Sequence, residues 1–385
     1  NIIYRLVTDL RGVFMKKILA MVFACLIMFT QVPAVFADSN LEPFSSESVY
    51  SGACEVVSVA ARQGIIPGQK DNRVDELFLA NEIPLYEVNS SNDLVNVSNL
   101  KYYPVLDQDD VAQGMIIARL ESNDSVVKYE YNTMFCNEIT ILKESLSSVC
   151  FIFDQNDTYI YDGSKYTIIF HDDAPDMNRG FLNIMARDSN QLERAFIVAD
   201  VQLELTSVVD STISGILNVP EIMQLPEWQN GCWAAAAISA GQYLNPSVDL
   251  TITDVMEKYA DGQDVAKSYL TVRDIIRDEY GQIPAAHLTD LRFTKVVEQI
   301  EEGEDNGKPI VARAAYDRLK SGHFVVVCGF DDVPSPGNCY VTVMDSLSGD
   351  YRVFPTSGWE GRTIVYYYST SGNHAYPITI YLVMT

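Results

Sequence analysis

Basic residues are scarce in this chain of 385 residues. Lysine and arginine total 27 against 52 aspartates and glutamates, which gives a net charge of −25. A surface this acidic is repelled by phosphate backbones, which argues against a protein that binds nucleic acid. Apolar residues make up 48% of the chain and charged residues 21%, a composition typical of a folded protein of two or three domains rather than a disordered one.

Long hydrophobic runs are absent as well. The longest run, Ile18–Phe29, has 12 residues, whereas a membrane-spanning helix needs about 20. This run follows Lys16 and Lys17 and precedes Val35-Phe36-Ala37, the order of a secretory signal peptide. We therefore expect residues 1–37 to be upstream residues plus a signal peptide, and the protein to be secreted, extracellular and free of the membrane after signal cleavage.

Histidine is rare, and the motifs of metal and cofactor sites are missing. The chain has four histidines, no cluster with metal-ligand spacing and no glycine-rich phosphate loop, so we expect neither metal nor cofactor. Six cysteines follow residue 37, too few for a disulfide scaffold. Cys328 and Cys339 flank a predicted hairpin, and they either pair or are buried free thiols.

The first half, residues 38–206, is predicted to be a β-rich N-terminal domain. It opens with apolar residues at helical spacing over 46–62. Short β-rich runs follow at 83–88, 114–120, 126–131, 149–153, 158–161, 166–170 and 195–205. The small, polar segment 207–217 has no clear period and is interpreted as a linker.

The second half, residues 218–385, is predicted to place helices before strands. Helical patterns cover 232–244, 271–280 and 294–302. Strand patterns cover 310–315, 324–330, 340–344, 351–354, 363–368 and 378–383. Helices followed by strands indicate an α+β fold rather than a parallel α/β sheet.

Cys232 is the first candidate for chemistry. It follows Gly231 and opens a predicted helix, where the helix dipole and free N–H groups favour an anion and so a reactive thiolate. A small buried thiol is the alternative interpretation.

A thiolate nucleophile needs an imidazole partner. His323 lies at the start of a predicted buried strand, whereas His287 and His374 lie in polar loops. Asp345 ends the next predicted strand, so an antiparallel pair would bring its carboxylate beside the ring. The alternatives are an ordinary edge histidine and a turn-initiating aspartate.

An acyl-transfer reaction also needs donors for an oxyanion. The Cys232 backbone N–H is one. The second is the side chain of Gln224 or Gln229, and the sequence leaves that choice open.

These motifs together resemble the papain-like cysteine peptidases. The resemblance lies in Gln224, in Gly231-Cys232-Trp233-Ala234, in the His323-Phe324-Val325 strand and in Met344-Asp345-Ser346. It is greatest to compact secreted bacterial members, similar to bacteriocin-leader peptidases, staphopains and bacterial effector proteases. The resemblance implies a two-lobed domain over 218–385, with Cys232 on a helical lobe and His323 and Asp345 on an antiparallel β-lobe.

The function that this resemblance implies is a secreted cysteine endopeptidase acting on protein or peptide substrates through a thioester. Cys232 would attack, His323 would move the proton, Asp345 would orient the ring, and Gln224 would bind the oxyanion. Residues 38–206 would then be a prosegment that inhibits the enzyme until it is cleaved, or a permanent domain. Alternatives are an amidase or acyltransferase with the same triad, and an inactive papain-like binding module.

Overall fold

The computed structural model describes most of the chain beyond residue 43. The described residues are 44–67, 76–89, 91, 93–120, 127–145, 147–154, 157–171, 192–205, 213–225, 227–301, 307–315, 322–333, 338–347, 349–356, 365–367 and 375–384. The expected signal peptide and residues 207–212 of the expected linker lie outside them.

The first half begins with helix α2, Ser46–Arg62, at the predicted position. The Ser45 side chain accepts a hydrogen bond from the Ser48 N–H and caps the helix start. The helix buries an apolar face that includes Val49, Val56 and Val57. A second helix, α3 at Cys136–Glu144, was not predicted, because it buries a single apolar side chain and so has no clear helical period.

The strands of the first half are short and mostly lie where β-rich runs were predicted. They are β1 Leu77–Ala80, β2 Leu85–Val88, β3 Leu94–Asn96, β4 Leu100–Asp107, β5 Ala112–Leu120, β6 Val127–Asn132, β7 Ser148–Asp154, β8 Asp157–Tyr161, β9 Tyr166–His171, β10 Ala195–Phe196 and β11 Ala199–Gln202.

In the second half, helices come before strands, as the sequence pattern predicts. The short strands β12 and β13 are the exceptions. Its helices are α5 Cys232–Leu244, α6 Ile252–Ala260, α7 Tyr269–Tyr280 and α8 Phe293–Glu301. Its strands are β12 Ile213–Ile216, β13 Pro284–His287, β14 Ile310–Ala315, β15 Gly322–Val333, β16 Asn338–Asp345, β17 Asp350–Thr356, β18 Val365–Tyr367 and β19 Ala375–Met384. Part of the segment expected to be a linker is therefore a strand, because β12 pairs antiparallel with β15 along its whole length.

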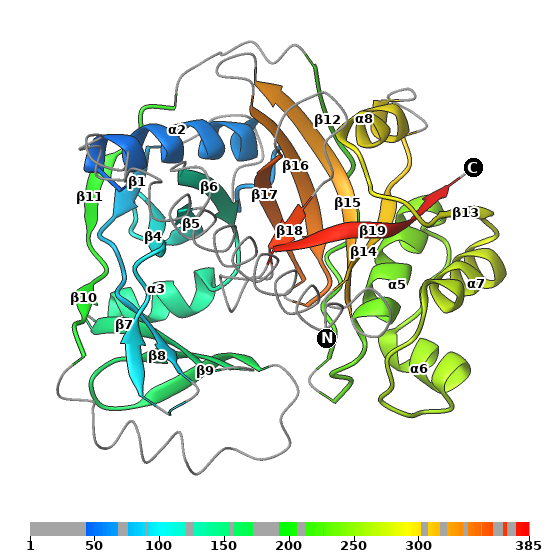
Figure 1. The fold of residues 1–385 in the computed structure, drawn as a ribbon, viewed down its shortest axis with the longest axis horizontal. Coiled ribbons are helices and arrows are strands. Elements are labelled where there is room, and N and C mark those ends of the chain that lie inside the picture. The colour runs from blue at the N-terminus through cyan, green and yellow to red at the C-terminus, as the bar shows by residue number, and fades with distance from the viewer. Residues whose placement is uncertain are drawn as a thin grey trace, which may run out of the picture. The chain divides into compact units, whose positions relative to one another are not determined.

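One large sheet runs through both halves. Among the described strands it has the order β11-β1-β4-β5-β6-β17-β16-β15-β14-β19-β13, with β12 and β18 paired at its side (Figure 1). The two halves meet where β6 pairs with β17, with Arg352 opposite Asn132 and Val353 opposite Tyr131. A second sheet, β3-β2-β7-β8-β9 with β10 beside β7, contains strands of the first half only.

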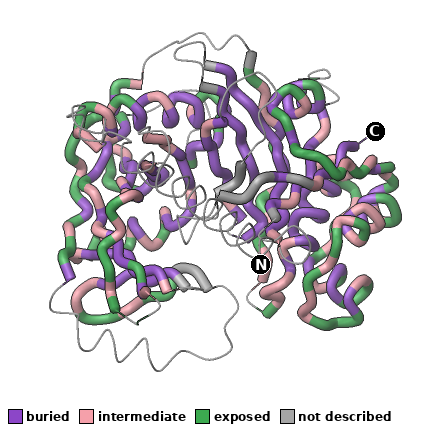
Figure 2. The backbone as a smooth tube through the Cα atoms, viewed as in Figure 1, coloured by how far each residue is buried: buried purple, intermediate pink, exposed green. Residues whose placement is uncertain are grey.

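Helices cover this sheet in both halves. Helix α2 contacts β6 and β17, and helix α5 contacts β14 and β15 as well as helices α6 and α7. The strands in the middle of the sheet and helix α5 are the most continuously buried parts of the backbone in Figure 2. The described chain is thus a mixed α+β fold with largely antiparallel sheets, in which β2 and β7 form a parallel pair.

Two further findings concern the whole described chain. None of its helices combines the length and hydrophobicity that crossing a membrane requires. Cys328 and Cys339 are buried free thiols, and the register of β15 and β16 explains why they do not pair, because Cys339 lies opposite Asp332.

Candidate active site

The start of helix α5 positions Cys232. The turn before it closes through a hydrogen bond from the Gly231 N–H to the Trp228 carbonyl at 2.8 Å. A side chain at Gly231 would come within 2.7 Å of that carbonyl oxygen, so the turn requires glycine. The buried Trp233 indole donates to the Val265 carbonyl at 3.1 Å and anchors the first turn of the helix. Cys232 itself stays partly exposed, as a nucleophile must.

Strands β15 and β16 bring His323 and Asp345 together. Val325 lies directly opposite Asp345, so His323, two residues earlier on the same face, lies diagonally across from the carboxylate. The distance between His323 Nε2 and Asp345 Oδ1 is 2.6 Å. Both side chains are buried, at 3% and 0% exposure. The predicted antiparallel pair of strands is thereby confirmed.

Cys232 is the other group that acts on the His323 ring, both through its charge and through a side-chain interaction that favours the protonated ring. Because Nε2 faces Asp345, Nδ1 is the ring nitrogen that remains for the thiol. Burial lowers the pKa of the imidazolium, but the charges and hydrogen bonds of Asp345 and Cys232 outweigh burial and raise that pKa to about 10. The ring therefore holds its proton at neutral pH when the sulfur is a thiolate.

Asp345 is held at both of its oxygens. Oδ1 accepts the Leu347 N–H at 3.0 Å in addition to its contact with His323. Oδ2 accepts from Arg352 Nη1 at 3.1 Å. Ser346, the next residue, donates its hydroxyl to the Phe324 carbonyl and ties the end of β16 to β15. The carboxylate is thus fixed in position, as an orienting group requires.

Gln224 packs against the turn that leads to Cys232. Its backbone N–H donates to the Ser346 carbonyl at 2.8 Å, and its Nε2 donates to the Gln229 carbonyl at 3.0 Å. Gln229 contributes its backbone to this contact. The structure therefore brings Cys232, His323 and Asp345 together. It also places the Gln224 amide against the Gln229 carbonyl, three residues before the cysteine.

His287, another histidine of the second half, lies away from this group. His287 stacks on Tyr381 with 5.0 Å between ring centroids, on β13 and β19. His374 lies outside the described residues. Among the described side chains, no three metal-binding residues gather in the arrangement of a metal site.

Sequence reasoning missed two arginines near the triad. Arg313 on β14 lies against Gly322, and the negative charge of Cys232 acts on it. Burial lowers the pKa of its guanidinium, and the thiolate charge works in the opposite direction. Arg352 binds Asp345 from β17. Both arginines are charged residues inside apolar strand patterns, and this is the sequence signal that could have found them.

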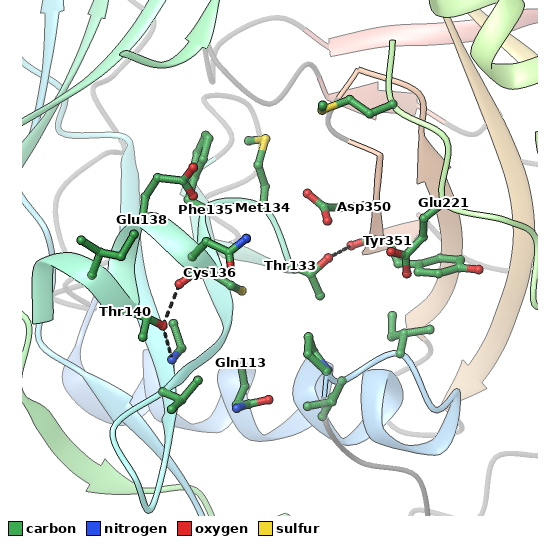
Figure 3. A pocket seen from close by; sticks show the side chains of 18 of the residues that line it. Gln113, Thr133, Met134, Phe135, Cys136, Glu138, Thr140, Glu221, Asp350 and Tyr351 are labelled. Carbon is green, nitrogen blue, oxygen red and sulfur yellow. Dashed lines mark hydrogen bonds between the residues drawn. The ribbon is translucent and has the colours of Figure 1, made fainter. Parts of the chain in front are cut away.

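A pocket of about 1220 Å³ opens beside the hairpin that carries Asp345 (Figure 3). Glu138 from α3 lies on one side of it, and Glu221 and Asp350 lie on the other. Burial raises the pKa of Asp350 to about 7, and the neighbouring charges of Glu221, Asp345 and Glu138 act in the same direction. The pocket is therefore acidic, and one of its carboxyl groups titrates near neutral pH.

The comparison with protein families bears on the second half. Residues 216–374 match the model of the Peptidase_C39 like family. The match covers less than half of the chain, but it contains Gln224, Cys232, His323 and Asp345. It indicates a cysteine peptidase related to the papain-like group, without selecting the bacterial branch that the sequence resembles. No curated protein matches the sequence.

Proposed function

We propose that the protein is a cysteine endopeptidase whose catalytic triad is Cys232, His323 and Asp345. The proposal rests on the 2.6 Å contact between His323 and Asp345, at the ends of two paired strands, and on the influence of Cys232, at the start of helix α5, on the same ring. A thiolate beside a protonated ring beside a carboxylate is the arrangement that a thiol nucleophile needs.

In the proposed first step, the Cys232 thiolate attacks the carbonyl carbon of the scissile peptide bond. The negative charge that forms on the oxygen is stabilised by the Cys232 N–H and the Gln224 amide. His323 then gives its proton to the leaving amine, the C–N bond breaks, and the acyl group stays on sulfur as a thioester.

The second step releases the acid. His323, now neutral, takes a proton from water while the water oxygen attacks the thioester carbon. The C–S bond breaks, the carboxylic acid leaves, and the thiolate–imidazolium pair returns. Asp345 keeps Nε2 of the ring engaged throughout, so that Nδ1 faces the sulfur in both steps.

Export and processing remain proposals that rest on the sequence. The pattern over residues 15–37 supports secretion. The N-terminal half is either a cleavable prosegment at 38–206 or a permanent domain, and the pairing of β6 with β17 favours the permanent domain.

The test is to treat the purified protein with a thiol-directed epoxide and to run a casein gel beside Cys232→Ala. We expect the label on Cys232, a cleared casein band for the wild type, and neither for the variant. Labelling without casein cleavage would favour an amidase or acyltransferase. An unlabelled Cys232 together with intact casein would contradict the proposal and favour a binding module.

A further inference from the structure

Arg352 is a buried cation shared between the two halves of the chain. Its Nη1 donates to Asp345 Oδ2 at 3.1 Å, and its Nε donates to Glu130 Oε1 at 2.7 Å. Its Nη2 lies 2.5 Å from the same Glu130 oxygen. Arg352 is 1% exposed and the Glu130 side chain 6%. Glu130 belongs to β6, outside the second half in which the whole triad lies.

Strand register explains why these residues meet. Arg352 lies opposite Asn132 of β6, so Glu130, two residues earlier on the same face, is its diagonal neighbour. On the other side, Asp345 lies opposite Asp350 of β17, which places Arg352 diagonally across from Asp345. Four adjacent strands, β6, β17, β16 and β15, therefore carry Glu130, Arg352, Asp345 and His323 in a row.

The charges along this row alternate, and Cys232 extends the alternation beyond His323. A guanidinium out of contact with water needs carboxylate partners to offset its lost hydration. Glu130 supplies one such carboxylate and Asp345 another. Without Glu130, Arg352 would interact more strongly with Asp345 and would compete with the His323 ring for that carboxylate.

We propose that Glu130 is a positioning residue for the triad, and that the N-terminal half is consequently a permanent part of the working enzyme. Glu130 acts through Arg352, which sets the orientation and charge of Asp345. This inference rests on the proposed role of the triad, and its test therefore includes a readout that requires no peptide substrate.

Other contacts between the halves supply a matched control. Tyr340 of β16 donates its hydroxyl to Glu55 Oε1 at 2.7 Å, so Glu55 also joins α2 to the shared sheet. Its contact reaches the same strand as Asp345 but lies five residues away, at Tyr340. Glu55→Gln therefore removes a comparable charge between the halves while leaving the row of four residues intact.

The experiment measures how fast iodoacetamide alkylates Cys232 in the folded full chain between pH 5 and 11, with mass spectrometry to read the site. The thiolate sulfur attacks the methylene carbon, a thioether forms and iodide leaves, so the rate reports the thiolate and its neighbouring ring. The proteins are the wild type, Glu130→Gln and Glu55→Gln. The rate of casein hydrolysis is measured for the same three proteins.

We expect Glu130→Gln to shift the alkaline step of the alkylation profile to lower pH by about one unit. Arg352 then has one carboxylate fewer to offset its charge, and this disfavours the His323 imidazolium. We expect kcat/KM for casein to fall about tenfold or more, because the ring is less well placed. Glu55→Gln should keep the wild-type profile. A folded Glu130→Gln with the wild-type profile would overturn the inference.

A second variant covers the case in which Glu130→Gln does not fold. Glu130→Asp keeps the charge but withdraws the carboxylate by one methylene, so its alkaline step should move in the same direction by a smaller amount. A folded Glu130→Asp with an unchanged profile would then overturn the inference. Failure of the wild type to cleave casein contradicts the proposed peptidase activity, while the alkylation profile still decides the role of Glu130.

Discussion

At the scale of single residues, the site is built from charges that have lost most of their water. Asp345 is fully buried, yet each of its oxygens accepts a hydrogen bond from a fixed donor. His323 is nearly as buried and keeps its proton because anionic partners flank it. Burial without partners would have favoured the neutral forms of both groups. The site therefore depends on the pairing of these groups as much as on their identity.

Asp350 provides a prediction about pH and stability. Its pKa is raised from 3.8 to about 7 in the folded state, so the folded protein holds a proton that the unfolded chain releases between these values. The contribution of this group to stability is present below pH 3.8 and is lost as pH rises through about 7.

Replacing Asp350 by asparagine should therefore raise the free energy of unfolding at pH 8, by on the order of 1–4 kcal/mol. The difference from the wild type should shrink toward zero near pH 4. Urea denaturation at both pH values measures it, with exposed Asp200→Asn as the control. If the difference in free energy of unfolding between Asp350→Asn and the wild type were the same at both pH values, the pKa of Asp350 would not be raised in the folded protein.

At the scale of secondary structure, sequence patterns located most elements but missed several, including helices α3 and α6 and strand β4. Helix α2 begins and ends where its apolar period predicts, and helix α5 lies where its alanine-rich sequence predicts a helix, although α5 is buried on all sides. The pattern around Thr271 predicted the start of α7, but the helix begins at Tyr269 and Ser268 is its cap. Helix α6 was missed, although its capping box of Thr251 and Asp254 was a readable signal.

Helix α2 lies close to strand β6 at a glycine, which gives a test of its packing. A Cβ at Gly52 would come within 2.1 Å of the Tyr129 ring, whose hydroxyl is hydrogen-bonded to Ser48 on the same helix. Helix propensity alone favours alanine over glycine by about 1 kcal/mol. Overpacking costs about 1–3 kcal/mol and should outweigh that gain.

Gly52→Ala should accordingly lower the free energy of unfolding, measured by urea denaturation. Ser51→Ala, an exposed change on the same helix, is the matched control and should leave stability nearly unchanged. If Gly52→Ala proved more stable than the wild type, the gain in helix propensity would exceed the cost of overpacking. That result would contradict the close packing of α2 on the Tyr129 ring.

At the scale of the whole described chain, the join between the halves is the feature that sequence patterns could not supply. The pattern around Arg352 indicated a strand, and so did the pattern around Glu130. Nothing local to either strand specifies that β6 and β17 pair, because pairing of strands so far apart in sequence is decided by the packing of the whole sheet. The residues proposed as catalytic could be picked out from the sequence because each stands at the end of an element with its own sequence signal.

The most direct test of the account is the rate at which His323→Ala hydrolyses casein, compared with the wild type. His323 is proposed both to stabilise the Cys232 thiolate and to protonate the leaving amine, so kcat/KM should fall by about 10²–10⁴-fold in a protein that remains folded by circular dichroism. Equal rates in the wild type and a folded His323→Ala would contradict the proposed triad.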